Sequence, residues 1–402
     1  MSVTPTLSIR EATDAELARW DELVARFPAC RVVHKRSWIR SLEASGFGRP
    51  LHLVYERGGD IVGCLPGLLA GVGPFTLFGS PMAGWQSVSM GPVFDPARAS
   101  AREVSTLLVP FLESRYGVDH IEIISATLGE DAMTPLGFRG EQMTTFRAPL
   151  TPDDPTRTFR AMKESARRNV KRATQLGLTT RLGVNPAFVD EHYAQIRAVF
   201  ARGGNVVPFG RERLASFVRH MEESGSLIAA AVYLADGTCI GTATFTIDGS
   251  ELLLWMWAHD VRYRWYRPTE LMTWTTMQAA MERGCTTLDF MGRGDFKAVF
   301  GARPEDEKQR WVRSRHAWIT RARDLAGHGY RWQQALRGRV ARWRLDDRPL
   351  NPPAAAASTA VAGGGHADKG AKREGAVAAT GVGIETASRS RQQRSPLQRI
   401  DR

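Results

Sequence analysis

The residues that could do chemistry are densest in the segment 284–301. Asp289 lies in a short apolar run that is typical of a β-strand, and Lys297 follows a few positions later. Gly292 and Gly294 separate the two, so the backbone there can turn sharply or approach a ligand closely. A carboxylate among apolar residues requires a partner. The segment therefore predicts either a reaction centre built on Asp289 and Lys297, or a strand end where Asp289 pairs with a nearby arginine.

The elements that must position this segment recur along the chain. Residues 59–63 and 237–241 are both glycine-bounded hairpin turns. Each hairpin is followed by a predicted amphipathic helix that ends at a glycine, Gly117 or Gly284, before another short strand. This weak repeat predicts two α/β domains in tandem. The alternative is that hairpin, helix and strand recur because they are common building blocks of α/β proteins.

The chain divides into predicted regions of different composition. The polar, proline-stiffened segment 151–155 marks a junction, so residues 1–153 and 154–324 are the predicted domains. Residues 325–348 combine arginines with apolar residues at helical spacing, which predicts a basic amphipathic helix. Residues 349–402 are rich in alanine, glycine, serine and arginine, and this composition predicts a disordered tail.

Positive charge is concentrated towards the C-terminus. The chain has a formal net charge of +12, and residues 308–348 contain 12 Lys/Arg against 3 acidic residues. Such a segment attracts phosphates, whether they belong to nucleic acid, to lipid head groups or to a substrate. The sequence contains no helix-turn-helix, zinc-finger or RNP motif, which disfavours sequence-specific nucleic-acid binding.

Cysteine, histidine and hydropathy patterns indicate the compartment and the cofactor class. The four cysteines are scattered without a CxxC pair, and the nine histidines form no HxxxH or HExxH motif. We therefore expect reduced thiols and no bound metal. The first 20 residues are charged and lack the apolar run of a signal peptide, and no segment has the roughly 18 apolar residues of a membrane span. These patterns predict a cytoplasmic protein.

Several motifs in residues 155–320 resemble the GNAT superfamily, and within it the Fem-type peptidyltransferases and their relatives in exopolysaccharide or cellulose gene clusters. The motifs are the hairpin 237–247, Trp255-Met256-Trp257-Ala258, the helix start Tyr266-Arg267-Pro268-Thr269-Glu270-Leu271-Met272, and the ending Asp295-Phe296-Lys297-Ala298-Val299-Phe300-Gly301. The basic segment 166–173 also resembles the helix that opens the second domain of this group. The resemblance extends weakly to the first half, and it implies two tandem GNAT-like domains with mixed α/β sheets.

The resemblance implies direct transfer of an acyl or aminoacyl group to an uncharged amine, without a covalent enzyme intermediate. Donor and amine would align in a cleft between splayed strands, where N–H groups and cations stabilise the oxyanion. It implies that Lys297 lies at the reaction centre. Asp289 is a candidate for proton transfer or for structural pairing. Glu270 is a candidate general base, although a carboxylate in a first helical turn is also favoured by the helix dipole.

The donor site departs from the usual GNAT pattern, because residues 262–269 lack the glycine-rich loop that binds the pyrophosphate of acyl-CoA. Arg264, Arg267 and Thr269 could still hold phosphates at a helix N-terminus. Tyr266 could act as an acid or stack on adenine, and aromatic residues are also common in cores. Acyl-CoA is the predicted co-substrate, and aminoacyl-tRNA is the alternative donor.

Other candidate residues would contact the acceptor. The basic residues Arg167, Arg168 and Lys171 share a predicted helix over residues 156–176, where they would hold a phosphorylated acceptor or form a solvated face. His259 ends a predicted strand and is either a cleft residue or a core histidine. Trp85 lies in an aromatic, glycine-rich loop that could bind a partner.

The sequence therefore predicts an acyltransferase that moves an acyl group from acyl-CoA to an amine in cell-envelope or exopolysaccharide metabolism. Its acceptor would be a small molecule or a glycan precursor, and the basic helix around residues 331–344 could contact an anionic membrane. One alternative is a Fem-like peptidyltransferase that uses aminoacyl-tRNA. The other is a non-catalytic, basic protein that binds membrane or nucleic acid.

Overall fold

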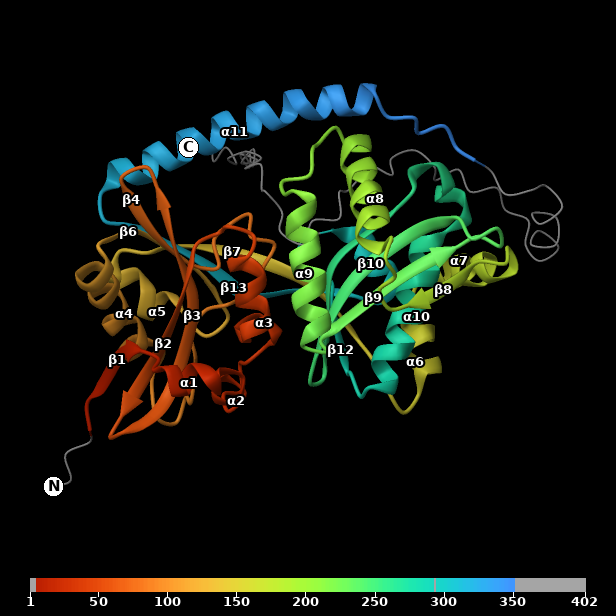
Figure 1. Cartoon of the computed structure of the whole chain (residues 1–402). Coiled ribbons are helices and arrows are strands. Elements are labelled where there is room, and N and C mark those ends of the chain that lie inside the picture. Colours follow the sequence, from red (N-terminus) through yellow and green to blue (C-terminus); the bar gives the residue numbers. More distant parts are fainter. Residues whose placement is uncertain (1–4, 293, 351–402) are drawn as a thin grey trace, which may run out of the picture.

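The computed structural model describes residues 5–292 and 294–350, and its central feature is a single 13-stranded sheet that runs through both halves of the molecule (Figure 1). The strand order is β1-β2-β3-β4-β6-β13-β7-β12-β11-β10-β9-β8, with β5 beside β3. The strands are β1 (Leu7–Glu11), β2 (Arg49–Arg57), β3 (Asp60–Val72), β4 (Phe75–Ser80), β5 (Val93–Phe94), β6 (Val118–Ser125), β7 (Arg139–Pro149), β8 (Thr179–Leu182), β9 (Leu227–Tyr233), β10 (Cys239–Asp248), β11 (Glu251–His259), β12 (Thr287–Asp289) and β13 (Arg303–Ser314).

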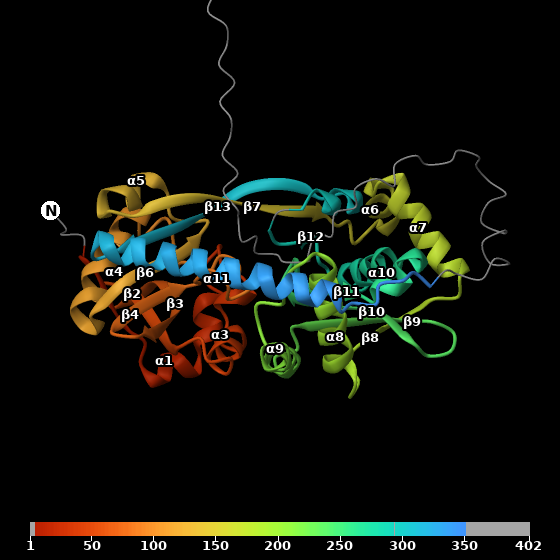
Figure 2. The same ribbon diagram turned by 90° about the horizontal axis from the view of Figure 1, so that it is seen from above.

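Helices cover this sheet and connect its strands (Figures 1 and 2). The α-helices are α1 (Asp14–Ala18), α2 (Trp20–Val24), α3 (Arg36–Glu43), α4 (Ala101–Tyr116), α5 (Glu130–Met133), α6 (Pro155–Ala161), α7 (Glu164–Gln175), α8 (Phe188–Arg202), α9 (Arg211–Glu223), α10 (Pro268–Glu282) and α11 (Ala317–Trp343). Short 3-10 segments are η1 (Val32–His34), η2 (Thr134–Leu136), η3 (Val261–Tyr266) and η4 (Asp295–Phe300).

The two halves repeat one pattern of elements. In the first, an antiparallel meander of β2, β3 and β4 leads through α4 to β6, which is parallel to β4. In the second, the meander of β9, β10 and β11 leads through α10 to β12, which is parallel to β11. The glycines that end the helices, Gly117 and Gly284, have the positive φ values of 61° and 84° that a sharp helix end requires. The repeat expected from the hairpins is thus present in the topology.

Each half of the sheet is completed by the strand that follows the other half in the chain. Strand β7 follows β6 but pairs with β12, whereas β13 follows β12 but pairs with β6. The two exchanged strands also pair with each other. Residues 303–314 were expected in the C-terminal domain, yet Trp311 is fully buried in the core of the first half. A boundary drawn by chain order therefore does not divide the sheet.

A third apolar core lies between the halves and joins them. Helix α3 of the first half faces α9 of the second (Figure 1), with Trp38 and Phe217 rings 5.4 Å apart. Phe217 also stacks on Trp255 of β11 at 3.9 Å. The Trp255 indole N–H donates to the Gln86 carbonyl of the first half at 3.0 Å. The halves therefore share interior side chains as well as strands.

Several predicted boundaries differ from the structure for local reasons. The single helix expected over 156–176 is two helices, α6 and α7, because Met162 and Lys163 take extended ψ values of 149° and 150°. The Lys163 N–H donates to the Val299 carbonyl at 2.8 Å instead of continuing the helix. Helix α11 begins at Ala317 rather than at residue 325.

Helix α11 lies along the outside of the molecule and spans both halves (Figures 1 and 2). It approaches the body closely at Gly338, where a Cβ atom would lie 2.0 Å from the Gly204 carbonyl oxygen. Arg342 donates to the Arg202 carbonyl at 3.0 Å on the same side. Within the described residues, no helix is both long enough and apolar enough to cross a bilayer. Most of the tail predicted over 349–402 lies outside the described residues.

Candidate active site

The parallel strands of the second half separate where a β-bulge bends β11. Strand β12 pairs with β11 over three residues, ending at Leu253 opposite Asp289. Next to that point the register of β10 against β11 shifts, because Thr244 and Phe245 oppose Met256 and Leu254 and leave Trp255 as an extra residue. A bulge bends a strand and ends regular pairing. In the described chain, residues 254–259 of β11 consequently have no partner strand on the β12 side.

The first half lacks this separation. Strand β4 pairs with β6 from Thr76 to Ser80, which is nearly its full length. The two halves share a topology, but among the described residues only the second leaves a long strand edge without its parallel partner. Residues 254–258 on that edge are buried. An open edge offers backbone N–H and C=O groups to an extended ligand. The separation therefore locates the candidate site in the second half.

An aromatic cluster holds the loop that follows β12. Phe290, Phe296 and Phe300 surround Trp257 of β11, with ring centroids 5.6–5.7 Å away. This explains the phenylalanine spacing of the 295–301 motif, because both of its rings anchor η4 against β11. The motif ends at Gly301, whose φ of 82° and close approach to the Ala161 carbonyl suit a residue without a side chain.

Lys297 lies beneath this loop and is 2% exposed. Its ammonium donates to the Met291 carbonyl at 2.6 Å and to the Gly292 carbonyl at 2.9 Å. Met291 has a positive φ of 54°, so Lys297 holds a turn that is unfavourable for a non-glycine residue. Burial lowers the pKa of Lys297 to about 8, although the charge of Asp289 acts in the opposite direction. A group with this pKa can exchange a proton near neutral pH.

Asp289 is fully buried and connects the loop to the first half. Its Oδ1 accepts from the Thr145 hydroxyl and from the Met291 N–H at 2.7 Å. Its Oδ2 accepts from Arg31 at 2.7 Å and from Lys308 at 3.1 Å, and Arg147 lies at 3.5 Å. Burial favours the neutral acid, but the charges of Lys308 and Arg31 hold the pKa of Asp289 well below its usual range. A carboxylate so stabilised is a weak base, which favours the positioning role over proton transfer.

The predicted donor residues gather where η3 meets the N-terminus of α10. Arg267 precedes Pro268 with a φ of 62°, so a left-handed arginine makes the turn into α10. Its guanidinium lies 5.6 Å from the Trp265 ring centroid. The Thr269 hydroxyl lies 3.3 Å from His259 Nδ1. Burial lowers the pKa of His259 to about 4, which leaves a neutral imidazole at physiological pH.

Other predicted residues of this region have local partners. Arg264 donates to the carbonyls of Val261 and Asp347 at 2.9 and 3.1 Å. Tyr266 is half-buried, with its ring centroid 5.7 Å from that of Tyr263. The Glu270 carboxylate accepts from the Asn169 amide at 2.7 Å, and it joins α10 to α7.

The predicted acceptor residues do not form one site. Arg168 and Lys171 are exposed on α7, and Arg168 lies 3.8 Å from Glu164 in an exposed pair. Arg167 is half-buried, with a buried Nε that has no hydrogen-bond partner. Trp85 lies far away in the chain and in the fold. It is 5% exposed and stacks on Phe47 at 5.6 Å in the core between the halves, so its ring is unavailable as a surface contact.

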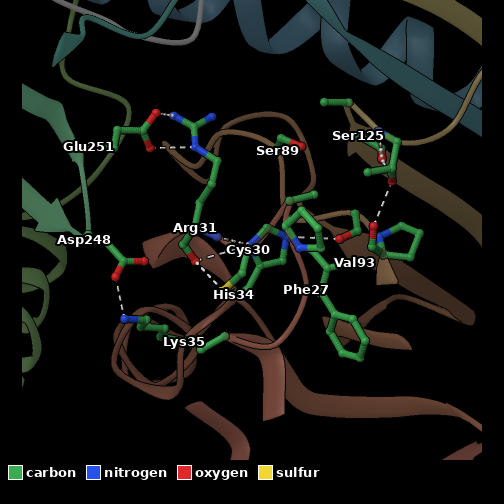
Figure 3. A pocket seen from close by; sticks show the side chains of 18 of the residues that line it. Phe27, Cys30, Arg31, His34, Lys35, Ser89, Val93, Ser125, Asp248 and Glu251 are labelled. Carbon is green, nitrogen blue, oxygen red and sulfur yellow. Dashed lines mark hydrogen bonds and ion pairs between the residues drawn. The ribbon is translucent and has the colours of Figure 1, made fainter. Parts of the chain in front are cut away.

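A cavity of about 650 Å³ lies between the halves (Figure 3), and its lining residues Arg31, Arg147 and Lys308 contact Asp289. Arg31, from the first half, extends across it and binds the Glu251 carboxylate with two hydrogen bonds of 2.6 and 2.7 Å. Lys35 pairs with Asp248 at 2.5 Å. The walls also include Arg147 and Lys308 of the exchanged strands.

Sequence reasoning missed this cavity and its charged residues. Arg31 contacts Glu251 and Asp289, which lie 220 and 258 positions further along the chain. Lys308 lies in a charged run, and its burial follows only from the exchange of β13. The one local signal was Asp289 itself, since a carboxylate in an apolar run requires a cation.

Comparison with known proteins identifies a matching family model and similar folds. Residues 160–309 match the family model described as an acetyltransferase (GNAT) domain. Among curated proteins, the sequence has no match. The crystal structure of FemX superposes with a TM-score of 0.62 at 16% identity, covering 75% of this chain and 96% of that one.

A conserved protein of unknown function from Bacteroides thetaiotaomicron has a TM-score of 0.51 at 12% identity, with 76% of this chain and 99% of that chain covered. At these identities the two structures share a fold with this chain. The predicted α/β class with mixed sheets and tandem halves is confirmed. The separated strands, the bulge and η4 all lie within residues 160–309, which match the GNAT acetyltransferase family model.

Proposed function

We propose that the protein is an N-acyltransferase that moves an acyl group from acyl-CoA to an amine acceptor. The observation that carries this proposal is the separation of β11 from β12 at the Trp255 bulge, within a GNAT acetyltransferase domain. The amide-bearing arm of the donor would lie along the free edge of β11, where it replaces the missing strand. Its thioester would then lie near the loop that Lys297 holds.

The phosphates of the donor would bind where α10 begins. The helix N-terminus carries partial positive charge, and Arg264, Arg267 and Thr269 add donors beside it. Tyr266 lies near enough in the chain to cover the adenine. Arg267 makes the turn and also carries a positive charge. This charge would bind the phosphates in place of the close backbone contact that a glycine allows.

The reaction joins the amine nitrogen to the acyl carbon and breaks the carbon–sulfur bond. The nitrogen loses one proton, and the departing thiolate gains one. Lys297, with a pKa of about 8, is placed in this proposal to give the proton to the thiolate. Asp289 would position the loop through the Met291 N–H, and Glu270 or the neutral His259 would take the proton from nitrogen.

The pathway and the alternative donor belong to this proposal as well. We place the acceptor in cell-envelope or exopolysaccharide metabolism, as the motif resemblance implies. The fold shared with FemX keeps an aminoacyl-tRNA donor as the second candidate, with Arg167, Arg168 and Lys171 of α7 as phosphate contacts. Exposed cations on a helix are suited to a polyanion.

Binding measurements separate the two donors. Calorimetry with acetyl-CoA should give saturable heat that Arg267→Gln weakens about tenfold, while the exposed control Arg168→Gln leaves it unchanged. Filter binding of tRNA at two salt concentrations should show only weak, steeply salt-dependent retention. Tight tRNA binding that Arg168→Gln weakens, without acetyl-CoA binding, would replace the acyl-CoA proposal by the aminoacyl one.

A peripheral contact with an anionic membrane is proposed for α11. Four large apolar residues of this helix are 41–86% exposed and follow one another at helical spacing, namely Trp332, Leu336, Val340 and Trp343. They lie opposite Gly338, which faces the body. Exposed Arg337, Arg339 and Arg344 border the stripe. Apolar residues flanked by arginines are typical of helices that lie in an anionic bilayer surface.

Vesicle flotation tests this contact. The protein should float with vesicles containing phosphatidylglycerol and remain in solution with phosphatidylcholine alone. The double variant Trp332→Ser/Trp343→Ser should reduce the vesicle-bound fraction of protein about tenfold or more, because each substitution removes a large apolar ring from the membrane contact. Trp265→Ser, which changes a 38% exposed tryptophan elsewhere, serves as the control. Equal flotation of both variants would disprove the α11 contact.

A further inference from the structure

We propose that the cavity between the halves binds an anionic group, a carboxylate or a phosphate, with Arg31 as its principal contact. The inference deepens the proposed function in one respect, because the anion would belong to the acceptor.

The lining of the cavity carries an excess of positive charge. Five cationic side chains and two carboxylates line a volume of about 650 Å³; the cations are Arg26, Arg31, Lys35, Arg147 and Lys308, and the carboxylates are Asp248 and Glu251. Asp289 and Glu305 contact these cations from outside the lining, which leaves five cations against four carboxylates. Burial lowers the pKa of His34 to about 4 and raises that of Cys30 to about 12, so neither changes this balance at neutral pH. A recessed, partly open cavity with excess cations attracts anions more strongly than a flat patch does.

Arg31 has an unused donor at the centre of this charge. Its Nε and Nη2 atoms bind Glu251 and Asp289. Its Nη1 is buried and has no hydrogen-bond partner in the described structure. A buried donor without an acceptor is unfavourable, so an oxygen that reaches Nη1 from the cavity would be bound at a group that the fold already orients. The Lys35 and Lys308 ammonium groups line the same cavity and have one carboxylate contact each.

The position of Asp289 would transmit occupancy of the cavity to the loop. Arg31 and Lys308 bind Asp289 Oδ2 from the cavity side. On its other side, Oδ1 fixes the Met291 N–H, and the Met291 carbonyl accepts from Lys297. An anion that shares Arg31 and Lys308 would therefore change the field at Asp289. The anionic group of the acceptor would therefore bind to residues that contact Asp289, and Asp289 in turn holds the loop at Met291.

Calorimetry on the full-length protein with inorganic phosphate and with acetate tests the site and separates the two chemistries. We expect saturable binding of one or both anions at low salt. Arg31→Lys keeps the ion pair with Asp289 but removes Nη1, and it should weaken binding about tenfold. Arg10→Lys is the matched control, since Arg10 also contacts two carboxylates but lies in the first half outside the cavity.

A second measurement locates the anion without depending on Arg31. Cys30 lines the cavity, whereas Cys239 does not. Both thiols are half-buried, and burial raises the pKa of each to about 12. Bound phosphate or acetate should slow alkylation of Cys30 by a small reagent at least threefold and leave Cys239 unaffected. If Arg31→Lys does not fold, Lys35→Gln should weaken this protection.

Three results would overturn the inference. They are no saturable heat with either anion, binding by Arg31→Lys equal to that of Arg10→Lys, and no difference in protection between the two thiols. None of these measurements contains acetyl-CoA. Failure of the cavity therefore leaves the transferase proposal intact, and failure of acetyl-CoA binding leaves the anion site intact.

Discussion

At the scale of residues, the candidate site depends on two buried ionisable groups whose environments act in opposite directions. Burial dominates at Lys297 and lowers its pKa to about 8. Cations dominate at Asp289 and keep it charged. The two side chains meet at Met291, which offers its N–H to one and its carbonyl to the other. The environment thus adapts the lysine for proton exchange and the aspartate for positioning.

The lowered pKa of Lys297 predicts how stability changes with pH. Above pH 8 the folded protein releases the Lys297 proton, whereas the unfolded chain keeps it up to about pH 10.5. Unfolding therefore takes up protons in this range, and the free energy of unfolding rises with pH. Relative to Lys297→Met, the wild-type protein should gain on the order of 2 kcal/mol between pH 7 and pH 10. Urea titrations at both pH values measure this gain.

The exposed Lys163 provides the matched control for that measurement. Lys163→Met should change the pH dependence of stability by less than about 0.5 kcal/mol. A wild-type curve parallel to that of Lys297→Met would show that Lys297 titrates normally, and its assignment as a proton donor near neutral pH would fail.

At the scale of elements, the site is made by irregularities in otherwise regular structure. The Trp255 bulge bends β11, and the short β12 leaves the β11 edge without a partner. The left-handed Arg267 turns the chain into α10. The corresponding β4 of the first half has a register shift at Thr76/Leu77 but stays paired with β6 as far as Ser80. The early end of the parallel pairing therefore distinguishes the half with the candidate site from the other half.

Arg267 offers a test of function against stability. A non-glycine residue at positive φ costs about 1 kcal/mol, so Arg267→Gly should raise the free energy of unfolding by up to about 1 kcal/mol. The same change removes a cation and should weaken acetyl-CoA binding about tenfold. Thermal melts and calorimetry on one preparation measure both effects.

Arg262→Gly is the comparison variant, because Arg262 lies in the same loop without a positive φ. Here glycine should lower stability by about 0.5–1 kcal/mol, since no strain is relieved. If Arg267→Gly lowers the free energy of unfolding as much as Arg262→Gly does, the positive φ of Arg267 does not strain the folded protein.

At the scale of the whole molecule, strand exchange makes the two halves one folding unit. Strand β13 crosses from the second half into the core of the first, and β7 crosses in the other direction. The cavity, the Asp289 cluster and the Trp255–Gln86 hydrogen bond all lie where the halves meet. A site built from both halves requires that they do not move independently.

A substitution of Trp311, in the core of the first half, tests whether the two halves unfold together. Trp311→Ala should cost about 3–5 kcal/mol, and it should increase hydrogen exchange equally at amides of β2 and β10. Trp343, which is 86% exposed, is the control, and its alanine variant should leave exchange unchanged. Faster exchange confined to β2 would show that the halves unfold separately.

The sequence by itself determined many of the elements and the segment that matches the family model. Hydrophobic periodicity and helix-ending glycines act over a few residues, so strands such as β9 to β11 and helices such as α4 and α10 were predictable within a few positions. Motif spacing placed Lys297 and Asp289 in one segment. The α6–α7 break was not predictable, because its cause is a hydrogen bond from Lys163 to Val299, far along the chain.

Only the tertiary structure decided which residues meet. The exchange of β7 and β13, the core around Trp85 and the cations on Asp289 depend on contacts across as many as 258 positions. Such contacts leave no periodic trace, because charge pairing and burial are set by the three-dimensional environment rather than by neighbours in the chain. Local physics therefore specified what the pieces are, and the long-range burial of a carboxylate among Arg31, Arg147 and Lys308 specified how they form a site.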